Sequence, residues 1–162
     1  MSELVFKTVW RQASPELVEE AKAFWTRTGL VAEGFRQRRS KELAVMIYDG
    51  DRLVGVATAE LEMLPGLGAR FAVVQGVVDP QFRRLSISMR TLGLMREVLE
   101  AWSSATPREK VMGMAGVVEA AEYADKSREP VWTDYGCGLT LVGHTARKNQ
   151  QIRVTWFAHA RL

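Results

Sequence analysis

The sequence predicts an α+β fold with a mostly antiparallel sheet of about seven strands, a parallel central pair and about four flanking helices. An apolar run at 69–78, a helical stripe and a second apolar run at 111–118 follow one another. This strand–helix–strand order implies a parallel pair with a right-handed crossover. Turn signals at 49–51 and 148–150 favour antiparallel hairpins. We interpret residues 1–162 as a single domain, because this length and an apolar content of 47% suit one hydrophobic core.

The N-terminal part of the chain is typical of a strand followed by two helices. Residues 4–10 alternate enough to form an opening strand. Ser14 is a good helix cap and Pro15 suits the first helical position. Apolar residues then recur at helical spacing until Gly29, which stops the helix. We expect a second short helix within the arginine-rich residues 30–42.

The remaining elements are predicted from apolar runs and breaker residues. Further strands are expected at 43–48, 53–61, 139–146 and 152–161. Residues 119–138 are expected to be mostly helical, with an interruption at Pro130. The last strand carries the aromatic pair Trp156 and Phe157, which permits a homodimer through an edge of the sheet.

Composition excludes several classes of protein. The single cysteine, Cys137, allows neither an internal disulfide nor a zinc–cysteine cluster. His144 and His159 do not complete a ligand set with close spacing, so we expect no metal site. The start of the sequence lacks the pattern of a signal peptide, and no apolar run approaches the roughly 20 residues of a membrane helix. We therefore expect a cytoplasmic protein that does not interact with a membrane.

Charge gives a weaker indication of the partner. The net charge of +3 suits an acidic ligand but is too small by itself to indicate nucleic acid. The basic cluster at 36–41 could bind RNA or an acidic substrate, although such clusters are usually solvated surface.

The segment after the apolar run at 69–78 has the features of an anion site. The run ends at Asp79, and Arg83 and Arg84 precede a helix with an apolar stripe at Leu92, Met95, Leu99 and Trp102. The first amide groups of a helix have no internal acceptor, and the helix dipole favours an anion there. We therefore expect a phosphate or pyrophosphate at this turn. The alternative is that the arginines are solvated and the nearby serines only cap the helix.

Residues 77–88, Val-Val-Asp-Pro-Gln-Phe-Arg-Arg-Leu-Ser-Ile-Ser, resemble the acetyl-CoA motif of the GNAT N-acetyltransferase superfamily. In that motif a strand ending in Val-x-Pro is followed by Arg/Gln-x-x-Gly-x-Gly/Ala and a helix. Arg83 falls on the Arg/Gln position, and Ser86 and Ser88 fall on the two small-residue positions. The expected order of elements, β-α-α-β-β-β-α-β-α-β-β, is also that of the superfamily.

The resemblance implies that the chain is a GNAT-like enzyme. Its activity would be acyl-CoA-dependent N-acyl transfer, with acetyl-CoA as co-substrate and direct attack by a primary amine. The strand end would pair with pantetheine and the amides of the turn would hold the pyrophosphate. The residues assigned to coenzyme A are Val77, Val78, Arg83, Arg84, Leu85, Ser86, Ile87 and Ser88. The acceptor would be a small-molecule or peptide amine, and the basic wall at 30–42 hints at one that carries a carboxylate.

The two serines depart from the glycines of the family motif. A Cβ atom at these positions can obstruct the ligand or disfavour a positive φ angle. A serine hydroxyl could instead donate to phosphate, or cap the helix at Ser88. Two hypotheses therefore stay open: a working acyltransferase, and a catalytically weakened GNAT-fold module that binds coenzyme A or a protein partner.

Tyr135 is the candidate general acid. Acyl transfer from a thioester needs a proton for the leaving thiolate, and members of the superfamily often take it from a tyrosine before the penultimate strand. Tyr135 lies in this region, but aligning Gly138 with the family's Gly-Phe puts Asp134 in that place. An aspartate would be a poor acid unless burial raised its pKa. Half-buried packing is the alternative role for Tyr135.

Glu62 is the candidate general base. Glu60 and Glu62 lie on the same face of a predicted strand, next to the expected cleft. Gln75, in the central strand, could orient a substrate or water but cannot accept a proton. The alternative for both glutamates is an exposed strand face.

Overall fold

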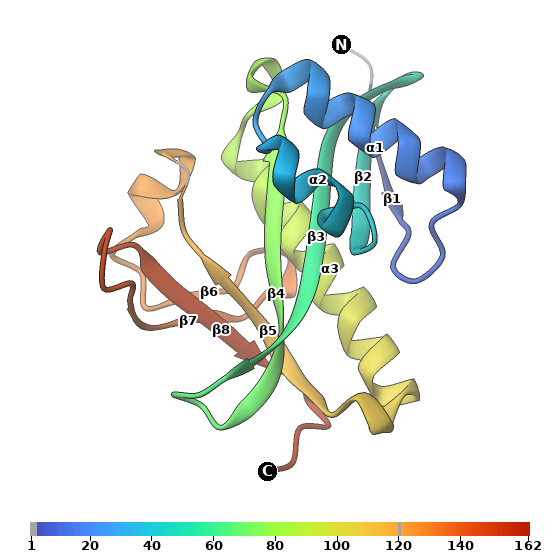
Figure 1. Ribbon diagram of the computed structural model, residues 1–162. Coiled ribbons are helices and arrows are strands. Elements are labelled where there is room, and N and C mark those ends of the chain that lie inside the picture. Colours follow the sequence, from blue (N-terminus) through green and yellow to red (C-terminus); the bar gives the residue numbers. More distant parts are fainter. Residues whose placement is uncertain (1–2, 120) are drawn as a thin grey trace. The chain divides into compact units, whose positions relative to one another are not determined.

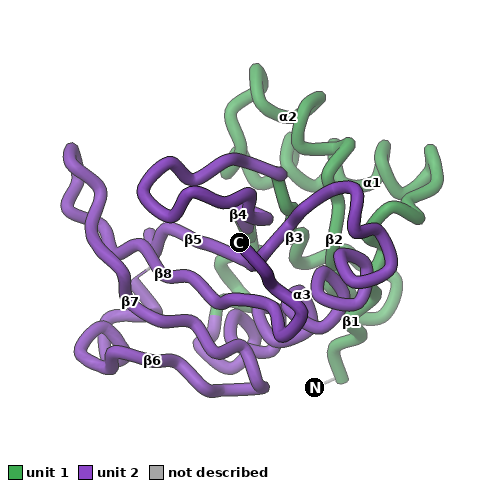
Figure 2. The backbone as a smooth tube through the Cα atoms, turned by 90° about the horizontal axis from the view of Figure 1, so that it is seen from below, with its two compact units in different colours: residues 1–60, 75–83 green, residues 61–74, 84–162 purple. Residues whose placement is uncertain are grey.

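The computed structural model describes residues 3–119 and 121–162 (Figure 1). The chain divides into two compact units (Figure 2). Unit 1 contains residues 1–60 and 75–83, and unit 2 contains residues 61–74 and 84–162. We describe each unit by itself.

The described residues form three α-helices, four short 3-10 helices and eight strands. The helices are α1 (Pro15–Thr28), α2 (Glu33–Arg39), α3 (Leu85–Ala105), η1 (Pro80–Phe82), η2 (Pro107–Glu109), η3 (Ala121–Lys126) and η4 (Asp134–Gly136). The strands are β1 (Leu4–Thr8), β2 (Leu43–Asp49), β3 (Arg52–Leu64), β4 (Ala69–Val78), β5 (Val111–Val117), β6 (Val131–Trp132), β7 (Leu139–His144) and β8 (Gln151–Trp156). None of the helices in these residues is long and apolar enough to cross a membrane.

Hydrogen bonds order the strands β1-β2-β3-β4-β5-β8-β7-β6. The pair β4–β5 is parallel, whereas β1–β2, β2–β3, β5–β8, β8–β7 and β7–β6 are antiparallel. The predicted α+β class, with a mostly antiparallel sheet and a parallel central pair, is confirmed. The strand beyond the expected seven is β6, which has two residues.

In unit 1, helices α1 and α2 cover one face of the strands β1 to β3 (Figure 1). The predicted limits of α1 are confirmed: the Ser14 hydroxyl accepts a hydrogen bond of 3.3 Å from the Leu17 amide. Gly29 adopts a left-handed conformation with φ of 66° and donates its N–H to the Trp25 carbonyl at 2.9 Å. The buried core beneath the helices consists of Val9, Ala21, Phe24, Trp25, Val31, Leu43, Met46, Leu53 and Val56.

The end of β4 is anchored in unit 1 by Asp79, which is 5% exposed. Its carboxylate accepts hydrogen bonds from Arg27 at 3.2 Å, Arg52 at 2.9 Å and the Gln81 amide at 3.1 Å. Its own amide donates to the Val54 carbonyl at 2.8 Å. Burial acts to raise the pKa of Asp79, but the amide bond and the two guanidinium groups together lower it below its ordinary value.

In unit 2, helix α3 packs against β5 and η4. Gly93 makes this approach close, because a Cβ atom there would lie 2.5 Å from the Tyr135 carbonyl oxygen. Arg153, which is 1% exposed, lies 4.0 Å from the centre of the Trp132 ring and donates to the Glu129 carbonyl at 2.7 Å. These contacts tie the segment between β5 and β7 to the helix and to β8.

The predicted helix over 119–138 is wrong in its extent. Residues 121–138 contain η3, the short strand β6 and η4 instead of an α-helix. The backbone breaks the helical pattern because Pro130 has no amide hydrogen and because Tyr135, Gly136 and Gly138 adopt left-handed conformations. The stacking of Arg153 on Trp132 holds β6 in place, and this long-range contact leaves no local pattern in the sequence.

The expectation that the last strand forms a sheet edge is also wrong. Strand β8 is hydrogen-bonded to β5 on one side and to β7 on the other. The backbone groups of Trp156 are therefore not offered to another chain as an open edge, and the homodimer remains a prediction without this support.

Candidate functional site

Helix α3 begins without a side-chain cap. Its N-cap residue is Arg84, whose side chain makes no capping hydrogen bond. Helix α1, in contrast, is capped by Ser14. Ser86 is exposed in the first turn of α3. The Ile87 and Ser88 amides donate to the Arg84 carbonyl, both at 3.2 Å. An anion at this helix start would therefore be bound by the amides of Leu85 and Ser86.

Ser88 does not cap this helix, because α3 starts at Leu85 and Ser88 is already the fourth helical residue. Ser88 is 8% exposed, and its hydroxyl donates to Glu122 Oε1 at 3.2 Å. Tyr123 also makes a side-chain hydrogen bond with Ser88, while burial raises the pKa of the Tyr123 phenol. A carboxylate and a phenol from η3 thus face the first turn of α3.

Tyr123 is a residue that the sequence interpretation missed. Its ring stacks on Trp132 with centroids 5.1 Å apart and an interplanar angle of 14°. It lies between β5 and β7, the same region in which Tyr135 was selected. Its position in the sequence could have identified it. Tyr123 is a second tyrosine soon after β5, the second strand of the parallel pair, in a segment that must fold back onto α3.

The pairing of the two parallel strands stops before the strands do. In the described register, β4 pairs with β5 from Arg70 opposite Val111 to Val73 opposite Ala115. Strand β4 continues to Val78. The later residues of β4 are thus outside this parallel register, as a strand that pairs with an extended ligand requires.

The residues assigned to the strand end and the turn lie as follows. Val77 and Val78 are half-buried in β4, and Val77 packs against the core of unit 1. The Arg83 guanidinium donates to the Val78 carbonyl at 3.4 Å. Arg84 is exposed and Leu85 is half-buried at the start of α3, whereas Ile87 is buried.

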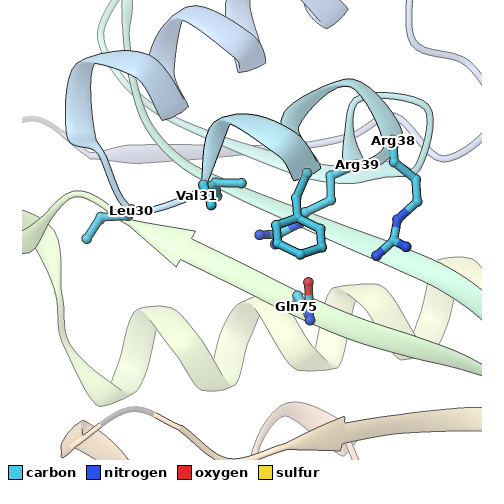
Figure 3. A pocket seen from close by; sticks show the side chains of 7 residues that line it. Leu30, Val31, Arg38, Arg39 and Gln75 are labelled. Carbon is cyan, nitrogen blue, oxygen red and sulfur yellow. The ribbon is translucent and has the colours of Figure 1, made fainter.

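A pocket of about 240 Å³ lies in unit 1. It is lined by Leu30, Val31, Ala32, Phe35, Arg38, Arg39 and Gln75. Figure 3 shows Arg38 and Arg39 reaching from the α2 segment toward β4, while Gln75 reaches from β4 toward α2. The pocket therefore combines an apolar wall, two guanidinium groups and one carboxamide.

The arginines of this pocket are held by different partners. Arg38 Nη2 lies 3.4 Å from Glu60 Oε2, in an ion pair whose side chains are 57% and 32% exposed. Arg39 donates to the Thr58 hydroxyl at 3.4 Å and lies 5.6 Å from the centre of the Trp25 ring. The basic cluster at 36–41 is thus partly built into unit 1, although its binding of nucleic acid remains untested.

Neither of the two predicted catalytic residues, Tyr135 and Glu62, lines this pocket. Tyr135 is 61% exposed, has a φ angle of 51° in η4, and lies against Gly93 through its backbone and Cβ. Glu62 is exposed on β3, and the pocket's lining residues do not include it. Gln75, expected to orient a substrate or water, does line the pocket. The catalytic roles of Tyr135 and Glu62 remain predictions.

The cysteine and histidines occupy separate surroundings. Cys137 Sγ is buried and donates to the Trp132 carbonyl at 3.2 Å, and burial raises the pKa of its thiol. His159 Nε2 lies 3.0 Å from the Ser103 hydroxyl, and His144 is exposed. Within residues 3–119 and 121–162, no group of three or more His, Cys, Asp and Glu side chains could hold a metal ion.

No family model matches the sequence. No curated protein matches it either. Solved structures do match the fold. The ribosomal-protein-S5-alanine acetyltransferase of Vibrio fischeri superposes with a TM-score of 0.61 at 8% identity, over 100% of this chain and 97% of that one.

Two further structures give the same result. NAA60 of Arabidopsis thaliana, in complex with acetyl-CoA, has a TM-score of 0.55 at 14% identity, over 95% of this chain and 98% of that one. A GNAT-family acetyltransferase of Streptococcus pneumoniae has a TM-score of 0.53 at 10% identity, over 95% and 99%. The chain therefore has the GNAT acetyltransferase fold, as its motif and element order predict.

Proposed function

We propose that this chain is an acyl-CoA-dependent N-acyltransferase of the GNAT superfamily that transfers the acetyl group of acetyl-CoA to a primary amine. The uncapped start of α3, directly after Arg83 and Arg84, carries this proposal. A helix start of this kind favours a diphosphate through its free amide groups, its dipole and the added positive charge. The fold supports the same conclusion.

In this reaction a neutral amine attacks the thioester carbonyl carbon, and the C–S bond breaks as the C–N bond forms. The amine loses a proton and the leaving thiolate gains one, so protons balance overall. In our proposal, residues 84–88 hold the diphosphate, Val77 and Val78 lie along the pantetheine, and Tyr135 protonates the thiolate. Glu62 is the proposed base, acting directly or through water.

Calorimetric titration with acetyl-CoA tests the binding half of this function. In Ser86→Glu the new carboxylate is compatible with a helix start but repels a diphosphate, so we expect at least about 10-fold weaker binding. Arg83→Ala should also weaken binding. Ser104→Glu, an exposed change near the other end of α3, is the matched control and should leave affinity unchanged. Equal affinity in all four proteins would exclude the proposed site.

A second candidate is a GNAT-fold module that binds coenzyme A without turnover. This candidate is the catalytically weakened module that binds coenzyme A or a protein partner. The carboxylate of Glu122 favours it, because this group is bonded to Ser88 in the first turn of α3 and opposes a diphosphate there. Release of free thiol from acetyl-CoA, measured with a broad panel of amines, separates the two functions. Sustained amine-dependent release supports the transferase, and binding without any release supports the module.

A further inference from the structure

The pocket in unit 1 has the chemistry to recognise a carboxylate. Arg38 reaches it from the α2 segment, and the chain itself places a carboxylate, that of Glu60, 3.4 Å from the Arg38 guanidinium. Arginine presents paired N–H donors that match the geometry of a carboxylate. A ligand carboxylate could therefore take the position of Glu60 at the same guanidinium without rebuilding the pocket.

The Arg38–Glu60 pair is suited to such an exchange. Both side chains are partly exposed, at 57% for Arg38 and 32% for Glu60. Exposed ion pairs contribute little to stability. Replacing Glu60 by a ligand carboxylate therefore costs the fold little. Glu42 also interacts electrostatically with Arg38 and Arg39, and this second carboxyl group beside the guanidinium groups disfavours a doubly charged phosphate.

The rest of the lining fits a ligand that has an apolar side chain and one amine. Leu30, Val31, Ala32 and Phe35 supply the apolar wall. Gln75 extends toward α2 from β4, and its carboxamide oxygen can accept a hydrogen bond from an amine (Figure 3). The volume of about 240 Å³ is below the usual range for drug-sized ligands, which favours a small molecule.

We propose that this pocket binds the acceptor of the reaction, and that the acceptor is a small amino acid with an apolar side chain, held through its carboxylate by Arg38. The acceptor role rests on the proposed acyltransferase function. In this arrangement Arg38 selects the carboxylate, the apolar wall holds the side chain, and Gln75 orients the amine.

A thermodynamic cycle of two ligands and two proteins tests the role of Arg38. L-leucine and L-leucinamide differ in the carboxylate, and their binding to the protein without acetyl-CoA can be measured by ligand-observed NMR. We expect the wild type to prefer leucine by about 10-fold and Arg38→Gln to abolish the preference. Because each ligand has the same amine in both proteins, the change in this ratio isolates the contact with the carboxylate.

Two more variants make the test two-sided. Glu60→Gln removes the internal competitor and should tighten leucine binding several-fold, whereas a merely structural ion pair would give weakening in both Glu60→Gln and Arg38→Gln. Lys41→Gln removes a positive charge from the same segment outside the pocket lining and should leave the ratio unchanged. A preference that survives Arg38→Gln, or weakening in both pair variants, would overturn the carboxylate site.

Turnover distinguishes this inference from the proposed function. Thiol release from acetyl-CoA that leucine stimulates in the wild type, and much less in Arg38→Gln, supports both. Equal stimulation by leucine and leucinamide in both proteins leaves the transferase standing and overturns the carboxylate-bearing acceptor. Binding of leucine with the expected ratio but no thiol release with any amine overturns the acceptor role and the transferase together.

Discussion

The hydroxyl of Ser88 donates a hydrogen bond of 3.2 Å to Oε1 of Glu122, across 34 positions of sequence. The first turn of α3 thus already faces a negative charge of the protein's own. An incoming diphosphate at the same turn would have to tolerate or displace this carboxylate. The contact gives unit 2 an internal competitor for the proposed anion site.

Glu122→Gln should therefore bind coenzyme A and acetyl-CoA several-fold more tightly than the wild type. Neutralising the side chain removes repulsion of the diphosphate while keeping a group that can accept the Ser88 hydrogen bond. Asp125→Asn, a neutralisation of an exposed residue on the same 3-10 helix, is the control and should change affinity less. Titration calorimetry at low salt measures the difference, and weaker binding in Glu122→Gln would contradict competition.

Asp79→Asn should lower the free energy of unfolding by about 1 to 3 kcal/mol, because Arg27 and Arg52 lose a buried anionic partner. Asp51→Asn, at an exposed turn, is the control. Urea unfolding at neutral pH measures both variants. A loss of stability in Asp79→Asn no larger than that in Asp51→Asn would argue against the anchoring role of Asp79.

The contribution of Asp79 should also depend on pH. Because the folded state lowers the pKa of Asp79 from its ordinary value of 3.8, the stabilisation is fully present above that pH. It is lost as pH falls below that value and through the folded pKa. The stability difference between wild type and Asp79→Asn should therefore shrink in acid. A difference that stays constant to the lowest pH at which the protein folds would contradict this assignment.

Gly93→Ala and Gly34→Ala should have opposite effects, although both replace a helical glycine. At Gly93 a Cβ atom would lie 2.5 Å from the Tyr135 carbonyl oxygen, so overpacking should destabilise unit 2 by about 1 to 3 kcal/mol. At Gly34 a Cβ atom meets nothing within 4 Å, so alanine should stabilise α2 by up to about 1 kcal/mol. Thermal unfolding monitored by circular dichroism measures both changes. Stabilisation in Gly93→Ala would contradict the close packing of α3 on η4.

Tyr135→Phe should lower kcat by about 100-fold or more if Tyr135 is the general acid. Stability should change little because the Tyr135 side chain is 61% exposed. Tyr123→Phe is the comparison, since this half-buried phenol makes a side-chain hydrogen bond with Ser88. Turnover that survives Tyr135→Phe but is lost in a folded Tyr123→Phe protein would transfer the acid role to Tyr123.

Short-range signals predicted most of the elements correctly. Ser14 and Gly29 marked the limits of α1, and the apolar runs located the central strands, because capping and burial act on neighbouring residues. The segment over 121–138 failed because its conformation depends on Arg153, which stacks on Trp132 and is supplied by a strand further along the chain.

The sequence by itself determined the class of fold, the parallel central pair and the turn with two arginines before a helix. These follow from periodicity, helix-stop residues and charge, which are local properties. Only the tertiary structure decided that β8 lies between β5 and β7, that Glu122 bonds to Ser88, and that Arg38 and Gln75 line one pocket. Such pairings join residues far apart in sequence, and the packing of the whole chain selects them over other partners of similar local chemistry.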